Sequence, residues 1–181
     1  MNKIPNLLTI FRICSIPLII FTILSSSNFY NMIAIILFIS ISITDYLDGF
    51  LARKLNVESK FGEMLDPIAD KILIICVLVA LMSNQTINGL SLIPAYLIIS
   101  REIFISGLRE FNAHNTSSNI KVSYLGKVKT TFQMLSLIFL ISSQINEIDN
   151  TYIINIGIAL LWISMILTVV SGYQYYKKIF Y

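Results

Sequence analysis

Six long apolar segments restrict the fold of this chain more than any other feature of its sequence. Each has about 20 residues or more, and a helix of about 20 residues crosses the ~30 Å hydrocarbon layer of a membrane. Helices are favoured because a segment in lipid must satisfy its own backbone hydrogen bonds, and the runs lack the alternation typical of strands. The sequence therefore predicts an all-α membrane protein, a bundle of six transmembrane helices in one domain over residues 1–181. The predicted spans are roughly 7–27, 30–52, 61–83, 90–111, 124–145 and 152–176.

The composition agrees with that class. Only 13% of the residues are charged, 56% are hydrophobic and the mean hydropathy is +0.77. In a soluble domain about a quarter of the residues are charged. Cys14 and Cys76 lie in separate apolar runs, so we expect two buried thiols and no disulfide. We expect no nucleic-acid partner.

The basic residues lie on one side of the predicted bundle. Eleven of the 13 Lys and Arg fall at the termini, in the connections between spans two and three and between spans four and five, or in the adjoining helix ends, and the other two, Lys71 and Arg101, lie within helices toward the same side. Positively charged loops stay in the cytoplasm, so both termini and these two connections are predicted to be cytoplasmic. The expected location is the inner (cytoplasmic) membrane of a bacterium, as a multi-pass protein.

Four aspartates lie at the cytoplasmic ends of the second and third predicted helices: Asp45, Asp48, Asp66 and Asp70. At about 100° per residue, the first two lie about 60° apart on one face and the last two about 40° apart. Small residues share these faces: Gly49, Ala52 and Gly62. If the two helices face each other, the four carboxylates form one cluster.

Such a cluster calls for a cation, because carboxylates that crowd together without one repel each other and become protonated. Oxygen ligands suit a hard divalent ion, and two ions can share four carboxylates. No His or Cys lies in residues 42–71, which argues against zinc, and His114 is expected to be a solvated loop residue. The sequence thus predicts a site for Mg²⁺ or Mn²⁺, with two ions.

Two alternatives remain for the aspartates. They can flank helix ends at the interface, neutralised by nearby bases: Arg53, Lys54, Lys60 and Lys71. They can also mark the ion pathway of a small cation transporter, but transport predicts acids near the bilayer centre and broken helices. Acids at the cytoplasmic ends of helices, beside basic residues, favour an enzyme.

The same stretch resembles the signature of the CDP-alcohol phosphatidyltransferases. It reads D-x-x-D-G-x-x-A-R from Asp45 to Arg53, then eight residues, then G-x-x-x-D-x-x-x-D from Gly62 to Asp70, with every fixed position present. The resemblance covers essentially the whole chain. It implies a six-helix membrane fold with a polar active-site cavity open to the cytoplasm, and a homodimer.

The resemblance also implies roles for the matching residues. Asp70 would be the general base on the acceptor hydroxyl, with Asp66 as the second catalytic carboxylate. The four aspartates would hold the metal ions, which neutralise the pyrophosphate and the leaving CMP. The nucleotide would be bound by Asp48, Gly49, Ala52, Arg53 and Gly62.

Three further stretches are similar to one branch of that family: "IPNLLTIFRICSIP", "SREIFISGLRE" and "GKVKTTFQM". Members of this branch transfer a phosphatidyl group from CDP-diacylglycerol to sn-glycerol 3-phosphate. They yield phosphatidylglycerophosphate and CMP, in the biosynthesis of phosphatidylglycerol, an anionic phospholipid. The acyl chains of the donor would stay among the membrane lipids. Sister enzymes that use inositol phosphate or serine as acceptor remain the alternative, because the signature does not separate them.

A phosphorylated acceptor needs its own basic pocket. The candidates are Arg101, Arg109, Lys127 and Lys129. Alternatively, Arg109 and the two lysines contact anionic headgroups, and Arg101 pairs with Glu102 or another carboxylate. Near the N-terminus, one helical face carries Asn6, Thr9 and Arg12, which either contact a phosphate or the nucleotide or cap the first helix.

Overall fold

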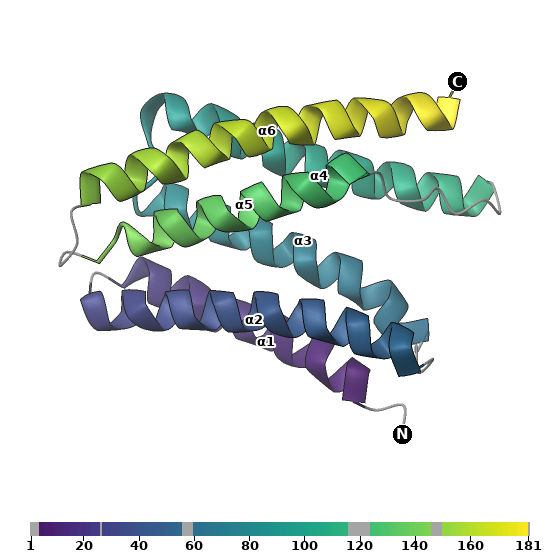
Figure 1. The fold of residues 1–181 in the computed structure, drawn as a ribbon, viewed down its shortest axis with the longest axis horizontal. Helices are drawn as coiled ribbons and strands as arrows, with labels where there is room; N and C mark the ends of the chain where they lie inside the picture. Colours follow the sequence, from purple (N-terminus) through teal and green to yellow (C-terminus); the bar gives the residue numbers. More distant parts are fainter. Residues whose placement is uncertain (1–3, 26, 56–59, 116–123, 146–149, 181) are drawn as a thin grey trace. The chain divides into compact units, whose positions relative to one another are not determined.

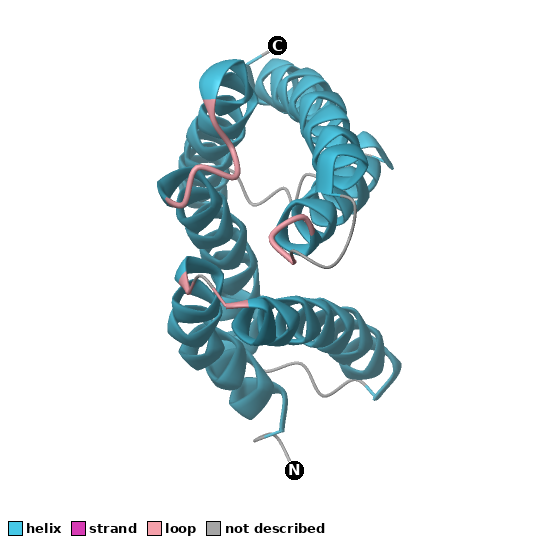
Figure 2. Ribbon diagram, turned by 90° about the vertical axis from the view of Figure 1, so that its left-hand side faces the viewer, coloured by secondary structure: helices cyan, strands magenta, loops and turns pink. Residues whose placement is uncertain are grey.

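The computed structural model describes residues 4–25, 27–55, 60–115, 124–145 and 150–180. These residues form helices and connecting loops, with no strand among them (Figure 1, Figure 2). The helices are α1 (Ile4–Leu24), α2 (Asn28–Leu55), α3 (Lys60–Ser83), the short 3₁₀ helix η1 (Gly89–Ser91), α4 (Leu92–Asn115), α5 (Tyr124–Ser142) and α6 (Asn150–Phe180). The all-α class and the six predicted helices are confirmed, with ends that differ by a few residues.

The chain divides into two compact units, which are described separately. The N-terminal unit comprises residues 1–86 and 141–150, and the C-terminal unit comprises residues 87–140 and 151–181. In the N-terminal unit consecutive helices run in opposite directions, and α1 packs against both α2 and α3 (Figure 1). Its core is mostly aliphatic and includes the fully buried Phe38 together with Ile16, Ile19, Ile23, Val77, Leu78 and Leu81.

A set of amide hydrogen bonds ties together the segments at one end of the N-terminal unit. Asn84, just beyond α3, donates from Nδ2 to the carbonyl oxygen of Ile23 and to Oε1 of Gln144, each at 3.1 Å. Asn31 of α2 donates from Nδ2 to the carbonyl oxygen of Gln144 at 3.0 Å. These side chains satisfy carbonyl groups that helix ends and loops leave without a partner. They therefore connect the ends of α1, α2 and α3 to one another and to the segment that follows α5.

In the C-terminal unit, α4 and α6 run in the same direction and α5 runs opposite to both (Figure 1). The buried residues of α6 recur every three or four positions and are mostly small: Gly157, Leu161, Ser164, Thr168, Ser171 and Gly172. Small residues at this spacing let helix backbones approach closely. At Gly157 the backbone carbonyl oxygen accepts a 2.8 Å hydrogen bond from Oγ of Ser136 on α5.

Two helical segments are long and apolar enough to cross a membrane, within the part of the chain that the structure describes. They are Gly89–Asn112 and Asn150–Phe180, with mean hydropathies of 1.4 and 2.5. Only 28% and 22% of their apolar stretches are buried, so they differ from the buried core helix of a soluble protein. Two shorter apolar stretches, Phe11–Leu24 and Asn28–Thr44, accompany them.

The prediction of two buried thiols is wrong for Cys14, which is exposed, while Cys76 is half-buried. Neither forms a disulfide. Large apolar side chains such as Phe11, Phe21 and Phe29 are also exposed, at 63%, 59% and 67%. An apolar run marks a helix suited to lipid, but it does not say which residues of that helix face protein.

Candidate functional site

An ion pair between α1 and α3 places Asp70, the predicted general base. Nη1 of Arg12 donates to Oδ1 of Asp70 at 3.0 Å, and the two side chains are 4% and 40% exposed. Arg12 lies in the third turn of α1 and is buried, so it is not at the end of the helix. The Arg12 side chain is thus buried inside the N-terminal unit, while the Asp70 carboxylate is partly exposed.

A groove of about 150 Å³ lies beside this pair, between α1 and α2. Its lining is mostly apolar and includes Phe11, Arg12, Leu37, Ser40, Ile41 and Thr44. Thr44 directly precedes Asp45 in α2, so the groove reaches the start of the aspartate signature. Apolar walls next to a buried cation suit a ligand with an acyl chain and an anionic group.

The remaining signature residues fall where helices were predicted. Asp45, Asp48, Gly49, Ala52 and Arg53 lie in the last turns of α2, and Gly62 and Asp66 lie in the first turns of α3. Their side chains are outside the described residues, as are those of Asn6, Thr9 and His114. The four-aspartate cluster therefore stays a prediction, of which only Asp70 is described.

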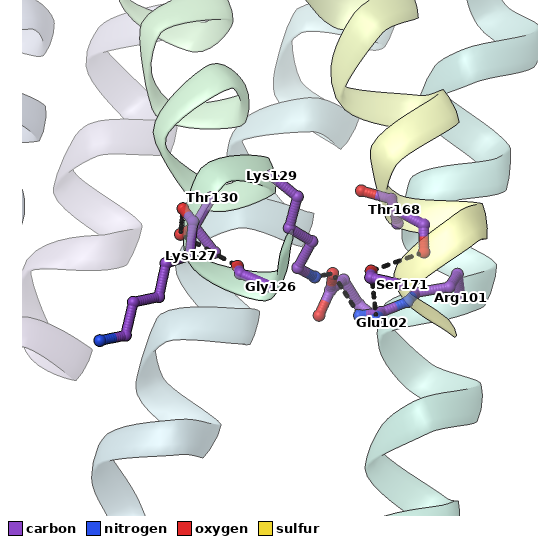
Figure 3. Close-up of polar contacts among 8 residues, drawn as sticks. All are labelled: Arg101, Glu102, Gly126, Lys127, Lys129, Thr130, Thr168 and Ser171. Carbon is purple, nitrogen blue, oxygen red and sulfur yellow. Dashed lines mark hydrogen bonds and ion pairs between the residues drawn. The ribbon is translucent and has the colours of Figure 1, made fainter. Parts of the chain in front are cut away.

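The second charged group lies in the C-terminal unit and centres on a buried carboxylate. Oε1 of Glu102 accepts from Nζ of Lys129 on α5, and also from Nη1 of its neighbour Arg101 at 3.2 Å (Figure 3). The side chains of Arg101, Glu102 and Lys129 are 12%, 8% and 8% exposed. Arg101 also reaches α6, where its Nη2 donates to Oγ of Ser171 at 3.0 Å. We call Arg101, Glu102, Lys129 and Ser171 the Glu102 cluster.

The charges of the Glu102 cluster do not balance. Two cations share one carboxylate, and Nε of Arg101 is buried without a hydrogen-bond partner among the described residues. Burying a cation costs several kcal/mol in general unless opposite charge and hydrogen bonds compensate. The cluster therefore has a surplus positive charge that suits an anion.

Two of the four predicted acceptor-binding residues lie outside this cluster. Arg109 is exposed, with its Cζ 5.5 Å from the centre of the Tyr175 ring, in a cation–π contact between α4 and α6. Lys127 is exposed and points away from Glu102 (Figure 3). The structure brings Arg101 and Lys129 together at Glu102. The predicted pairing of Arg101 with Glu102 is therefore confirmed, and binding of the acceptor phosphate stays a prediction.

Sequence analysis did not single out the α6 residues that meet Arg101. Ser171 and Gly172 are both buried, and Thr168 lies one turn before them. A signal for them exists in the sequence, because polar and small residues recur every three or four positions from Ser164 to Gly172 inside an apolar span. Gln133 on α5 was also missed. It is fully buried, and neither polar atom of its amide has a partner among the described residues.

Comparisons with known proteins cover nearly all of the chain. The family model described as CDP-alcohol phosphatidyltransferase matches residues 2–170. The chain belongs to the CDP-alcohol phosphatidyltransferase family. Membership makes it a transferase and removes the cation-transporter alternative. In this family member the signature residues run from the end of α2 into α3, and the last of them, Asp70, is the partner of Arg12.

Three relatives of this CDP-alcohol phosphatidyltransferase carry the name CDP-diacylglycerol–glycerol-3-phosphate 3-phosphatidyltransferase. One from Rickettsia bellii is 43% identical over 177 residues, which is 97% of this chain and 94% of the relative. One from Rickettsia felis is 42% identical with the same coverage. One from Salmonella choleraesuis is 39% identical over 174 residues, 96% of this chain and 92% of the relative. The likeness thus spans both units of the structure.

Proposed function

We propose that this chain transfers the phosphatidyl group of CDP-diacylglycerol to sn-glycerol 3-phosphate, giving phosphatidylglycerophosphate and CMP in phosphatidylglycerol synthesis. The observation that carries the proposal is the Glu102 cluster, whose buried surplus of positive charge suits an acceptor that bears a phosphate. The relatives support it, because their name specifies CDP-diacylglycerol and glycerol 3-phosphate.

In the proposed reaction, a hydroxyl oxygen of glycerol 3-phosphate attacks the phosphorus of the phosphatidyl group. The bond from that phosphorus to the oxygen of CMP breaks, CMP leaves with the electron pair, and Asp70 takes the hydroxyl proton. Arg12 orients Asp70 by donating to Oδ1, while the 40% exposure of the carboxylate leaves it reachable by substrate. A correctly placed base contributes about 10²- to 10⁴-fold to such a step.

The residues present fit the two divalent ions implied by the resemblance. The donors are carboxylates only, which suit Mg²⁺ or Mn²⁺, and the partly exposed Asp70 leaves one of the four within reach of a ligand. Asp45, Asp48, Asp66 and Asp70 would hold the ions. When bound, they would neutralise the pyrophosphate and stabilise the CMP leaving group. Gly49, Ala52 and Gly62 would leave room for the cytidine, and Arg53 would contact a nucleotide phosphate.

The setting we propose is a bacterial inner membrane, with the six helices as spans and the polar cavity and both termini in the cytoplasm. The apolar stretches of Gly89–Asn112 and Asn150–Phe180 support it because most of their residues are unburied. Lys177 and Lys178 in the last turn of α6 suit the cytoplasmic interface. A homodimer is the assembly that the family resemblance implies, and the mass of the protein–detergent complex tests it.

Acceptor competition separates the proposal from its nearest alternative. Inositol phosphate also carries a phosphate, so the Glu102 cluster suits it as well, whereas serine brings none. The first experiment is transfer by purified protein in detergent, with CDP-diacylglycerol, Mg²⁺ or Mn²⁺ and labelled glycerol 3-phosphate, inositol phosphate or serine. The expected result is metal-dependent labelled lipid from glycerol 3-phosphate. Greater use of another acceptor would overturn the proposal.

A further inference from the structure

The guanidinium of Arg101 is held from two sides before any substrate is present. Nη1 donates to Oε1 of Glu102 at 3.2 Å and Nη2 donates to Oγ of Ser171 at 3.0 Å. The Ser171 hydroxyl in turn donates to the carbonyl oxygen of Thr168 at 3.0 Å. A hydroxyl has one hydrogen, so this bond turns a lone pair of Ser171 toward Arg101. Helix α6 therefore offers Arg101 an oriented acceptor.

The next residue, Gly172, lets α6 approach the middle of the Arg101 side chain. A Cβ at this position would lie 3.0 Å from Nε of Arg101 and 3.4 Å from its Cγ. Gly172 is buried, so the α6 backbone packs directly against the Arg101 side chain, whose Nη1 and Nη2 are held by Glu102 and Ser171. A methyl group at position 172 would therefore require the Arg101 side chain to shift by a few tenths of an ångström, which strains its hydrogen bonds to Glu102 and Ser171.

Contacts of this kind matter for binding because a free arginine side chain loses rotamer entropy when it is ordered. An arginine already ordered by Ser171 and Glu102 loses less rotamer entropy when an anion binds, so more of the energy of the arginine–anion interaction appears as affinity.

Gly157, by contrast, meets an apolar neighbour, since a Cβ there would lie 2.9 Å from Cδ2 of Leu140. The two buried glycines of α6 therefore serve different contacts.

We propose that Ser171 and Gly172 form a seat on α6 that positions the Arg101 guanidinium and so sets the affinity for the phosphorylated acceptor. Both are positioning residues that act through Arg101, and neither touches the acceptor in this scheme. The inference rests on the proposed function, because it assigns the seat to the acceptor side of that reaction. It adds α6 to the elements that determine acceptor binding.

The test compares Gly172→Ala and Ser171→Ala with Gly107→Ala in the full-length protein. Gly107 is the matched control, because it lies inside α4 with nothing within 4 Å of an added Cβ. We expect Gly172→Ala to raise KM for glycerol 3-phosphate about tenfold and Ser171→Ala about threefold, with KM for CDP-diacylglycerol unchanged. Gly107→Ala should leave both values unchanged.

A double-mutant cycle with Arg101→Met distinguishes positioning from general damage to the helix packing. If the seat acts through Arg101, Gly172→Ala has no further effect on KM once Arg101 is methionine. An undiminished effect in that background, or equal changes in the KM of both substrates, would overturn the inference. If Gly172→Ala does not fold, Ser171→Ala decides, because it only removes a hydroxyl.

Failure of the proposed function is recognised separately. If the wild type does not use glycerol 3-phosphate, that function fails, whatever the variants do. The seat is then tested by inorganic phosphate, through the concentration that half-maximally raises the melting temperature. A higher half-maximal concentration in Gly172→Ala and Ser171→Ala than in Gly107→Ala supports the seat, and equal concentrations overturn it.

Discussion

Asp70 and Glu102 are both carboxylates that accept a hydrogen bond from an arginine, but their surroundings differ. Asp70 is 40% exposed beside a buried Arg12, whereas Glu102 is 8% exposed between two buried cations. The Asp70 region belongs to a signature with four aspartates, whose predicted cluster would give it an excess of negative charge. In the Glu102 cluster positive charge is in excess. An ion pair can thus hold a side chain in place at sites of either charge, and the contrast leads us to propose different ligands, a cation near Asp70 and a phosphate near Glu102.

The largest effect should come from Asp70→Asn. Asparagine keeps the oxygen that accepts from Arg12 but does not take a proton, so we expect kcat to fall about 10³-fold, with KM for glycerol 3-phosphate within about threefold. Transfer rates measured in detergent, with an unchanged melting temperature, would establish this. Retention of most of the activity would show that Asp70 is only a partner of Arg12, which would break the contrast between the two regions.

Arg101→Met should instead act on binding. Loss of a buried, hydrogen-bonded cation is expected to raise KM for glycerol 3-phosphate about 100-fold, with a smaller change in kcat. Arg101→Lys should not restore the wild-type value, because an ammonium lacks the planar fork that reaches both Glu102 and Ser171. Lys177→Met, a loss of charge at an exposed position of α6, is the control. An unchanged KM in Arg101→Met would remove the acceptor site from the Glu102 cluster.

Glu102→Gln tests whether the surplus positive charge is real. Removal of one partner of a buried ion pair typically costs about 3–5 kcal/mol, because the other charge is left uncompensated. We expect the melting temperature in detergent to fall, and added inorganic phosphate to restore part of the loss, with a larger increase than in the wild type. Equal phosphate effects in the two proteins would mean that no anion can replace the carboxylate.

Gly157→Ala should have a smaller effect, confined to stability. The added methyl group meets Leu140 at 2.9 Å, and overpacking of this kind costs about 1–3 kcal/mol. The melting temperature should fall while KM for both substrates stays at the wild-type value. A rise in KM for glycerol 3-phosphate alone would show that packing between α5 and α6 also controls the acceptor site.

The smallest effect is expected for Lys127→Met. Lys127 is exposed and points away from Glu102, so its loss should change KM for glycerol 3-phosphate less than about twofold. Lys129→Met, two residues along α5, should raise it at least about tenfold because Lys129 is buried and paired with Glu102. Kinetics of the two variants side by side would check this. Similar effects would mean that α5 contributes only general positive charge.

The fold was largely predictable because its signals are local. Long apolar runs predict helices whatever their neighbours are, and the six described helices end within a few residues of the predicted spans. The direction in which each side chain of a helix points was less predictable from the sequence. Cys14 lies in an apolar run and was expected to be buried, yet it is exposed. Where lipid is the surrounding medium, both faces of a helix are apolar, so periodicity alone does not separate the face toward protein from the face toward lipid.

The sequence by itself determined the six helices, the aspartate signature across α2 and α3, and the family to which the chain belongs, since all three are written in residues close together along the chain. It also named Arg101 and Lys129 as acceptor candidates, but on equal terms with Arg109 and Lys127. Only the tertiary structure showed that Glu102 joins Arg101 to Lys129, and that Lys127 lies apart from them. It also paired Arg12 with Asp70. Finally, it placed Ser171 and Gly172 of α6 against Arg101. The hydrogen bonds Lys129–Glu102, Arg12–Asp70 and Arg101–Ser171 join residues 27, 58 and 70 positions apart on different helices. They depend on how helices pack side by side, which no local pattern specifies.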